Sequence, residues 1–272
     1  MRRPSLDARR LASLAPGLEV EVLEEATSTN AVAADHARAG AAEGRVVVAE
    51  SQSAGRGRLD RVWQTPPRAA LLFSVVLRPT VAAADWPWLP LLTGHSVARA
   101  LQGLGYDAGV KWPNDVLVAR ADGESRKLVG ILVERIETPD GPAAIVGVGI
   151  NVSLTEAELP VPTATSLALS GATLRGDALA DAVLSGYLAA LRELYSDFVR
   201  LGADVEASGI LQLVSDYCTT LGQEVRVQLP GGSDLVGIAT EIDRAGRLVV
   251  RSLADGSVTA VAAGDVTHLR YE

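Results

Sequence analysis

Apolar and polar residues follow two different patterns along this chain, and the change between them comes late. The first two hundred or so residues mix continuous apolar runs, typical of buried strands, with segments of helical spacing. The apolar runs predict strands over 20–25, 45–51, 71–79, 127–137 and 143–154, with two shorter strands flanking a turn at 113–115. TPDGP joins the last two long strands and favours a hairpin.

Three main helices are predicted among these strands. The first is capped by Ser28 or Thr29 and runs through an alanine-rich segment to Gly40. The second covers 86–105, and the third covers 177–201 with leucines along one side. Residues 155–172 look irregular. Because strands and helices do not alternate regularly, we expect a single α+β domain built on a mixed β-sheet.

After Gly222 the pattern changes to short alternating strands separated by Gly and Asp turns. This pattern predicts a small antiparallel barrel of roughly fifty residues, near the lower size limit for a domain that folds alone. The expected organisation is therefore a leader over 1–17, partly helical or frayed, a main domain over 18–216 and a barrel over 217–272.

The charge balance argues against binding of nucleic acid over a broad basic surface. The chain has 25 Lys and Arg against 33 Asp and Glu, a net charge of −8. The three histidines, His36, His95 and His268, lack the spacing of zinc ligands, so we expect no dedicated metal site. An acidic body with local basic clusters suits a small anion better than a long polyanion.

The cysteine count and the chain start indicate a cytoplasmic protein. A single cysteine, Cys218, cannot form an internal disulfide, and we interpret it as a buried small hydrophobe. The start, MRRPSLDARR, is basic and polar, which argues against a secretory signal. No apolar run reaches the length of a membrane helix, so no membrane partner is expected.

The most informative segment is QSAGRGRLDRVW at 52–63. It alternates small residues with cations, namely Gly55, Arg56, Gly57, Arg58 and Arg61. Glycine lets a backbone approach a ligand closely, and arginine supplies charge-assisted hydrogen bonds to phosphate or carboxylate oxygens. The segment indicates a mobile loop that closes over an anion; an ordinary solvated loop is the alternative. GxxxxGK[ST] and strand–GxGxxG–helix are both absent, so a nucleotide would be held in another way.

Further motifs in a fixed order connect this loop to a known family. They are STN (28–30), QxxGRGR (52–58), KWPND (111–115), KLVGILVE (127–134) and GVGIN (147–151). The chain resembles the biotin protein ligases, also called biotin–[acetyl-CoA-carboxylase] ligases, over about Val20 to Ser153. The resemblance implies a catalytic domain of the class II aminoacyl-tRNA synthetase/biotin ligase-like type. The C-terminal barrel is similar to the SH3-like domain of that family.

This resemblance implies a two-step reaction. The carboxylate of biotin attacks the α-phosphate of Mg-ATP, which gives biotinyl-5′-AMP and pyrophosphate. A lysine of a biotin carboxyl carrier domain then attacks the acyl carbon, and AMP leaves. Cations must offset the repulsion of the two reacting anions, and a lid must hide the mixed anhydride from water. The Gly/Arg loop would serve both needs.

Family positions carry over to specific residues. Those implied to bind biotin are Ser28, Thr29, Asn30, Gln52, Gly55, Arg56, Gly57, Arg58, Lys127, Gly130 and Gly149. Those implied to bind the nucleotide are Arg58, Trp63, Asn114, Asp115, Lys127 and Asn151. Gly130 and Gly149 would keep the strands thin where ligand lies against them. Asp115 is a candidate contact for the Mg²⁺ of ATP, directly or through water.

The implied catalytic residues are Lys127 and Arg58, with Arg56 assisting. Lys127 would place a point charge near the biotin carboxylate and the α-phosphate, where it stabilises the pentacoordinate transition state. Structural roles remain open for several positions: a helix cap at Ser28 and Thr29, and a core aromatic at Trp63. A local turn would equally explain the Asn and Asp of KWPND.

One departure from the family pattern falls inside the loop. The family sequence often reads GRGRRGRxW, whereas here it is GRGRLDRVW, so Leu59 and Asp60 replace Arg and Gly. The loop loses one cation and one flexible hinge and gains an anion near the phosphates. We therefore expect its ordering, and its retention of the intermediate, to differ from those of the commoner sequence.

Three other functions stay open. A lipoate or octanoate transferase shares the fold class, although GILVE together with STN favours biotin. A biotin-sensing repressor would need an N-terminal DNA-binding domain, for which the residues before Ser28 leave no room, so no DNA binding is expected. A binding module that uses the barrel is the least favoured. The acceptor is implied only by the family, and a monomer and a weak homodimer are both compatible.

Overall fold

The computed structural model describes residues 6–14, 17–171, 174, 177–229, 233–262 and 264–269. The larger sheet has seven strands: β1 (Glu19–Leu23), β2 (Arg45–Ala49), β3 (Ala70–Leu77), β4 (Ala108–Lys111), β5 (Asp115–Ala119), β6 (Ser125–Ile136) and β7 (Ala143–Asn151). Their order across the sheet is β1-β2-β3-β7-β6-β5-β4. β1 and β2 run parallel, and every other neighbouring pair is antiparallel. The predicted mixed sheet is therefore confirmed.

The helices are α1 (Ala8–Leu14), α2 (Thr29–Arg38), α3 (Trp88–Gly103), α4 (Asp177–Arg200) and α5 (Ile210–Asp216), with short 3₁₀ turns at Ala83–Asp85 and Glu156–Glu158. The three predicted helices are present, and α1 lies in the predicted leader. The sequence prediction missed α5, because seven residues give too few turns for a helical period to stand out. Ser28 occupies the N-cap position of α2, but its side chain makes no capping hydrogen bond.

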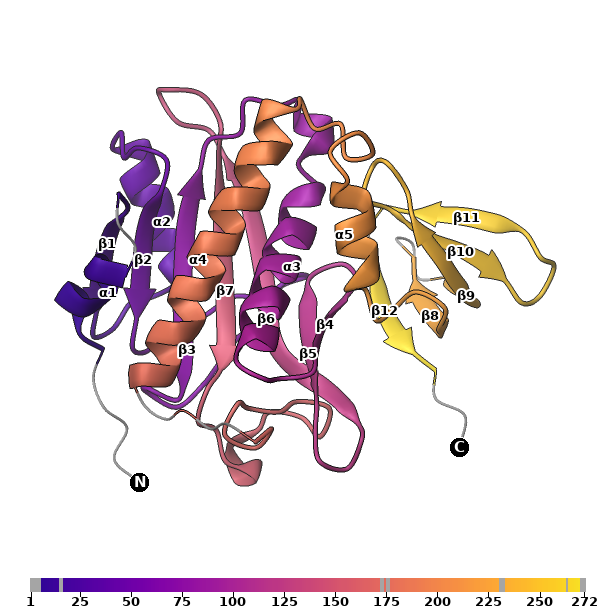
Figure 1. Cartoon of the computed structure of the whole chain (residues 1–272), viewed down its shortest axis with the longest axis horizontal. Helices are drawn as coiled ribbons and strands as arrows, with labels where there is room; N and C mark the ends of the chain where they lie inside the picture. Colours follow the sequence, from indigo (N-terminus) through magenta and orange to yellow (C-terminus); the bar gives the residue numbers. More distant parts are fainter. Residues whose placement is uncertain are drawn as a thin grey trace.

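The sheet carries helices on both faces. In Figure 1, α3 and α4 lie side by side across one face and α2 lies behind the other. The alternation of β2 explains this arrangement, because successive side chains of a strand point to opposite faces. Val46 and Val48 belong to the main core with α3 and α4, whereas Val47 packs with Ala33 and Ala37 of α2. Both faces are thus apolar near α2.

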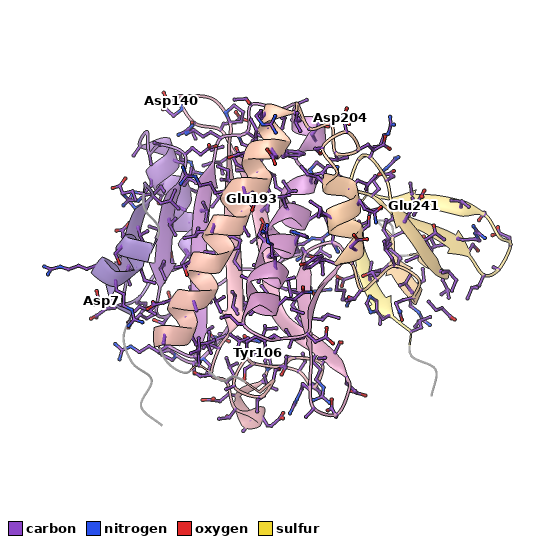
Figure 2. All side chains as sticks on the ribbon, viewed as in Figure 1. Asp7, Tyr106, Asp140, Glu193, Asp204 and Glu241 are labelled. Atoms are coloured by element: carbon purple, nitrogen blue, oxygen red, sulfur yellow. The ribbon has the colours of Figure 1, made fainter. Side chains whose placement is uncertain are left out.

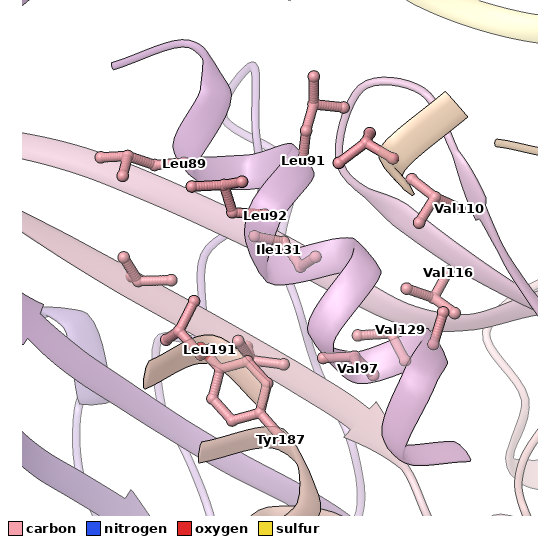
Figure 3. Packing of buried hydrophobic residues seen from close by; sticks show 14 of the residues in the cluster. Leu89, Leu91, Leu92, Val97, Val110, Val116, Val129, Ile131, Tyr187 and Leu191 are labelled. Carbon is pink, nitrogen blue, oxygen red and sulfur yellow. The ribbon is translucent and has the colours of Figure 1, made fainter. Parts of the chain in front are cut away.

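The main core lies between α3, α4 and the sheet. Figure 3 shows the leucines of α3 packed over the valines of neighbouring strands, with Tyr187 and Leu191 of α4 alongside. Leu92 and Leu101 of α3 are fully buried, as are Val110 and Val129 beneath the helix. Burial of such side chains is the main favourable contribution to folding.

The second sheet has five antiparallel strands: β8 (Glu224–Gln228), β9 (Asp234–Ile242), β10 (Leu248–Ser252), β11 (Val258–Val261) and β12 (Asp265–His268). Their order is β11-β10-β9-β8-β12, which matches the predicted SH3-like C-terminal unit. Val225, Val227, Ala239 and Leu248 fill its interior. Cys218, just before this unit, is buried as expected, and burial raises the pKa of its thiol.

Backbone hydrogen bonds attach the C-terminal unit to the large sheet. The Val110 N–H donates to the Tyr217 carbonyl over 2.7 Å, and the Thr219 N–H donates to the Val110 carbonyl over 2.8 Å. The indole of Trp112 donates to the Gly246 carbonyl over 3.0 Å. The chain around 217–219 therefore covers the edge strand β4, which would otherwise expose unpaired backbone groups.

Exposed carboxylates are spread over the whole molecule. Figure 2 labels Asp7, Asp140, Glu193, Asp204 and Glu241, which lie apart from one another on the main domain and on the C-terminal unit. Within the described ranges, no helix combines the length and the apolar character needed to cross a membrane. Residues 1–5 and 15–16 of the predicted leader, and residues 270–272 of the predicted barrel, lie outside the described residues.

Substitution of Leu92 by Ala should destabilise the protein. Leu92 is 0% exposed between α3 and the sheet, and a buried Leu→Ala change costs about 2–5 kcal/mol, because it leaves a cavity. Urea unfolding would measure the change. The matched control is Leu213→Ala on α5, where the side chain is 46% exposed and little stability should be lost. Equal effects of the two substitutions would contradict the assignment of α3 to the core.

Candidate active site

The floor of the site is a flat patch on the sheet face that carries α2. Gly130 of β6 and Gly149 of β7 are direct cross-strand partners. Leu72 of β3 pairs with Gly149, and Asp115 of β5 pairs with Gly130, so one row crosses four strands. A methyl group on either glycine would lie 2.6 Å from the Trp63 ring. The two glycines therefore allow the indole to lie directly on the sheet.

Beside this row, a third glycine makes room for a polar side chain. A methyl group at Gly147 would lie 2.1 Å from Oδ1 of Asn30. The Asn30 side chain is buried, and its amide nitrogen donates to the Leu132 carbonyl over 3.2 Å and to Oε2 of Glu134 over 2.7 Å. The hydroxyl of Ser74, the cross-strand partner of Gly147, lies 2.6 Å from Asn30 Oδ1. Hydrogen bonds from two strands, β3 and β6, therefore fix Asn30 above the space left by Gly147 of β7.

Thr29 and Asn30 of the STN motif form one connected polar cluster with Gln52 and Ser74. Oε1 of Gln52 accepts from the Thr29 backbone N–H over 2.7 Å and from the Thr29 hydroxyl over 3.1 Å. The Ser74 hydroxyl lies 2.8 Å from Thr29 Oγ1. Ser28, Thr29 and Asn30 are all at most 5% exposed, although they stand at the start of a helix. Buried polar groups arranged in this way are suited to recognising a polar ligand group.

The predicted mobile loop is a β-hairpin in this structure. The Trp63 N–H donates to the Gly55 carbonyl over 2.9 Å, and the Gly57 N–H donates to the Arg61 carbonyl over 2.6 Å. A methyl group on Gly55 would lie 2.1 Å from the Trp63 carbonyl oxygen, so only glycine fits at the base of the hairpin. The hairpin carries the Trp63 indole onto the glycine floor.

The tip of the hairpin has an unusual composition. Leu59 and Asp60 have φ angles of +54° and +56°, and the Arg61 N–H donates to the Arg58 carbonyl over 3.2 Å. Two central residues with positive φ are the pattern of a type I′ turn, which favours Asn-Gly. A left-handed conformation costs a side-chain-bearing residue about 1–2 kcal/mol, less for Asp than for Leu. The departure seen in the sequence thus falls on the two most demanding positions of the loop.

A cavity of about 600 Å³ lies over the floor and brings together cations from distant segments. Nη1 of Arg58 donates to Oδ1 of Asn114 over 2.8 Å. Nζ of Lys127 lies 2.7 Å from Oδ1 of Asp115 and 5.7 Å from the centre of the Trp63 ring. Burial lowers the pKa of Arg58, and the charge of Asp115 partly opposes that shift. The hairpin and the sheet therefore direct positive charge into one space.

Lys111 is a cavity residue that the sequence prediction missed. Burial lowers the pKa of its ammonium group, with further lowering by Lys127 and Arg61 and an opposing effect of Asp115. A partly desolvated lysine beside other cations is typical of an anion site. Lys111 is the first residue of KWPND, and the sequence interpretation assigned nucleotide contacts only to Asn114 and Asp115 of that motif.

Every predicted site residue except Gly55 lines this cavity. They are Ser28, Thr29, Asn30, Gln52, Arg56, Gly57, Arg58, Trp63, Asn114, Asp115, Lys127, Gly130, Gly149 and Asn151. Gly55 supports the hairpin from below instead, so a direct contact between Gly55 and a ligand stays a prediction. The amide nitrogen of Asn151 donates to the Thr165 carbonyl over 3.0 Å, which attaches the loop after β7 to the cavity wall.

The C-terminal unit supplies part of the cavity wall, which the sequence did not indicate. Asp265, Val266 and Thr267 of β12 line the cavity. Arg61 of the hairpin forms an ion pair with the Asp265 carboxylate. The barrel thereby contacts the same hairpin that carries Arg58 and Trp63.

Comparisons with known proteins agree with this geometry. The sequence model of the Biotin/lipoate A/B protein ligase family matches residues 22–151, and that of the Biotin protein ligase C terminal domain matches residues 220–269. A biotin–[acetyl-CoA-carboxylase] ligase of Mycobacterium tuberculosis is 37% identical over 98% of this chain and 97% of its own length. The bifunctional ligase/repressor BirA of Escherichia coli is 31% identical over 96% of this chain and 78% of its own.

Solved structures show the same architecture. A biotin protein ligase from Aquifex aeolicus, in complex with biotin and ATP, superposes with a TM-score of 0.71 at 25% identity, over 93% of this chain and 99% of that one. A biotin protein ligase from Leishmania major, in complex with biotinyl-5-AMP, gives a TM-score of 0.56 at 27% identity, over 91% and 100% of the two chains.

The chain therefore belongs to the biotin/lipoate A/B protein ligase family. Its relatives along the full length place it among the biotin protein ligases, and it is an enzyme of the ligase class. The fold expected from the motif resemblance, a biotin ligase-like domain with an SH3-like C-terminal unit, is confirmed.

Substitution of Gly149 by Ala should displace Trp63 from the floor. The added methyl group would lie 2.6 Å from the indole, so the ring must move away. The other tryptophans, Trp86, Trp88 and Trp112, are at most 8% exposed, so acrylamide quenching of fluorescence reports mainly on Trp63. We expect stronger quenching in Gly149→Ala. Gly103→Ala, where no atom lies within 4 Å of the added group, is the matched control and should leave quenching unchanged.

Substitution of Asp60 by Gly should order the hairpin. Glycine adopts the positive φ at this position without steric cost, and that relief is worth about 1 kcal/mol. Hydrogen exchange at the Gly57 and Trp63 amides should therefore slow about fivefold, and the affinities for biotin and its adenylate should change as well. Asp140→Gly, in the exposed turn after β6, is the control. Unchanged exchange and unchanged affinities in Asp60→Gly would show that the turn does not limit the hairpin.

Proposed function

We propose that this ligase activates biotin with ATP inside the cavity and then transfers it to a lysine of a biotin carboxyl carrier domain. The observation that carries this proposal is the convergence of Arg58 from the hairpin and Lys127 from β6 on one cavity. The relatives that share the full length are named as biotin ligases, and the solved relatives bind biotin, ATP or biotinyl-5-AMP, which supports the same reaction.

The polar cluster at one side of the cavity suits the ureido ring of biotin. Thr29, Asn30 and Gln52 present hydroxyl and amide groups that are already held by neighbouring hydrogen bonds. Preorganised polar groups bind a ligand without an ordering cost. The apolar floor under Trp63 would then accept the rest of the biotin molecule, as the indole shifts from its resting place.

The cations at the other side would bring the two anions together. Lys127, Arg58 and Lys111 all line the cavity. Arg58 and Lys111 are partly buried, so water screens their charges less than it would at an open surface. Charge grows on the phosphoryl oxygens as the biotin carboxylate attacks, and fixed cations stabilise that charge. Asp115 and Asn114 now hold Lys127 and Arg58 at 2.7 and 2.8 Å, which keeps both cations in place before substrate arrives.

The hairpin would act as the lid over the mixed anhydride. It carries Arg56 and Arg58 on its first strand and Trp63 at its end, so one movement places charge and covers the ligand. Exclusion of water protects an activated acyl group from hydrolysis. The ion pair of Arg61 with Asp265 makes the C-terminal unit part of this closure, which is the role that we propose for the barrel.

The residues present also fit a magnesium ion that enters with ATP. Mg²⁺ is commonly held by one or two carboxylates together with substrate phosphates. Asp115 lines the cavity beside Asn114 and is the carboxylate that would take this place. When bound, the ion would neutralise phosphate charge. Across the described residues, no group of three or more His, Cys, Asp or Glu could hold a metal ion on its own.

We further propose that the ligase acts in the cytoplasm, without binding DNA, as a monomer or weak homodimer. The single cysteine supports the compartment, and the net charge of −8 supports the absence of DNA binding. A carboxylase carrier domain is the proposed acceptor, because a biotin–[acetyl-CoA-carboxylase] ligase is similar to this chain over nearly its whole length.

An incubation with biotin, Mg-ATP and a carrier domain, followed by intact-mass analysis, tests the proposed reaction. Lys127→Ala should suppress adenylate formation by about two orders of magnitude, since it removes a cation from the reacting centre. Arg58→Gly should instead let activated biotin escape and label bystander lysines, because the hairpin loses the guanidinium that would bind the adenylate. Biotin-dependent ATP–pyrophosphate exchange measures the first step alone. Exchange with lipoate but none with biotin would reverse the substrate assignment.

A further inference from the structure

A single carboxylate oxygen joins the hairpin to the polar cluster at the far side of the cavity. Oε2 of Glu134 accepts from Nη2 of Arg56 over 2.9 Å and from the amide nitrogen of Asn30 over 2.7 Å. The two donors come from the hairpin and from α2, and the acceptor comes from β6. Glu134 itself does not line the cavity, whereas both of its partners do.

The strand pattern explains why Glu134 reaches both partners. Side chains two residues apart share one face of a strand, so Glu134 faces the same way as Gly130 and Leu132. Its cross-strand partner is Ile145, which packs with α2, so the carboxylate emerges between α2 and the hairpin. Its side chain is 29% exposed and that of Arg56 is 49% exposed. Water screens this contact, so by itself it contributes little, as surface ion pairs generally do.

Hydrogen bonds continue from Asn30 back to the start of the hairpin. Asn30 Oδ1 lies 2.6 Å from the Ser74 hydroxyl, which lies 2.8 Å from that of Thr29. Thr29 donates to Gln52, and the Gln52 side chain lies against Gly55 at the base of the hairpin. One polar network therefore contacts the hairpin twice, at its base and at Arg56.

We infer that Glu134 is a positioning residue that couples occupation of the Asn30 cluster to closure of the hairpin. The inference rests on the proposed function, because it takes the Asn30 cluster to be where biotin binds. A ligand bound at Asn30 contacts the residue that shares Glu134 Oε2 with Arg56, so it stabilises the arrangement in which the carboxylate holds Arg56 and the hairpin over the cavity. The coupling is reciprocal, so a closed hairpin also strengthens ligand binding at Asn30. Glu134 touches no reacting atom in this scheme.

The direct test is Glu134→Gln, which keeps the size of the side chain and removes the charge that holds two donors on one oxygen. Trypsin can cleave after Arg58 and Arg61, so the cleavage rate of the native protein reports hairpin opening. Without ligand, cleavage should be about fivefold faster in Glu134→Gln, as expected for loss of one partly exposed charge-assisted contact. Saturating biotin should slow cleavage of the wild type but protect the variant much less.

Two further variants separate positioning from a general structural effect. Glu137→Gln removes another carboxylate of the same region, which pairs with Arg135 over 2.7 Å and is 68% exposed; it should match the wild type. Arg56→Gln leaves the Glu134 side chain in place and should speed cleavage after Arg58 and Arg61 as much as Glu134→Gln does. The double variant should be no faster than either single one, because residues in one network have non-additive effects.

The outcomes distinguish this inference from the proposed function. Calorimetry of the wild type with biotin tests the function, and absence of binding would refute it whatever Glu134 does. If the wild type binds biotin but Glu134→Gln keeps full biotin protection of the hairpin, the coupling is wrong. Fully additive cleavage rates in the double variant would also overturn it. If Glu134→Gln does not fold, Arg56→Gln alone decides the question by the same protection measurement.

Discussion

The site depends on the absence of side chains at three places on the sheet. Gly130, Gly147 and Gly149 lie on one face of β6 and β7, and an added methyl group at each would collide with Trp63 or Asn30. Strands normally present a side chain at every second residue, so a flat patch of this kind exists only where glycines meet in register. A single residue slip of the β6–β7 pairing would turn these positions to the face that carries α3 and α4 and remove the floor.

The charges around the floor come as paired groups rather than as free cations. Arg58 is held by Asn114, Lys127 by Asp115 and Arg56 by Glu134, each at 2.7 to 2.9 Å. All three partners orient the cations, and the carboxylates of Asp115 and Glu134 also offset the repulsion between them. A polyanionic substrate can then replace weaker partners without a large reorganisation of the protein, which is the condition for strong electrostatic catalysis. The barrel takes part in the same arrangement through Asp265.

Much of the fold follows from patterns that are local in the sequence. Long apolar runs predicted the strands, and the leucine spacing over 177–201 predicted α4. Such patterns can be read locally, because the apolar positions of a strand or a helix recur every few residues. α5 was not predicted, because its seven residues, which follow a left-handed Gly209, are too few to show a helical period of apolar positions. The cavity residues were largely foreseen as well, because the family motifs are short and uninterrupted. Lys111 and Glu134, each at an end of such a motif, were not predicted as site residues.

The residue order thus indicated which side chains are candidates for the chemistry, and folding decided what each one touches. That Arg56 meets Glu134, or that Arg61 meets Asp265, follows from strand register and from the docking of the C-terminal unit against β4. The sequence also did not predict that the 52–63 loop is a hairpin, because Leu-Asp at its tip is not the usual composition of a type I′ turn. Such contacts join residues that are far apart in the chain, and only the packed sheet brings them within hydrogen-bonding distance.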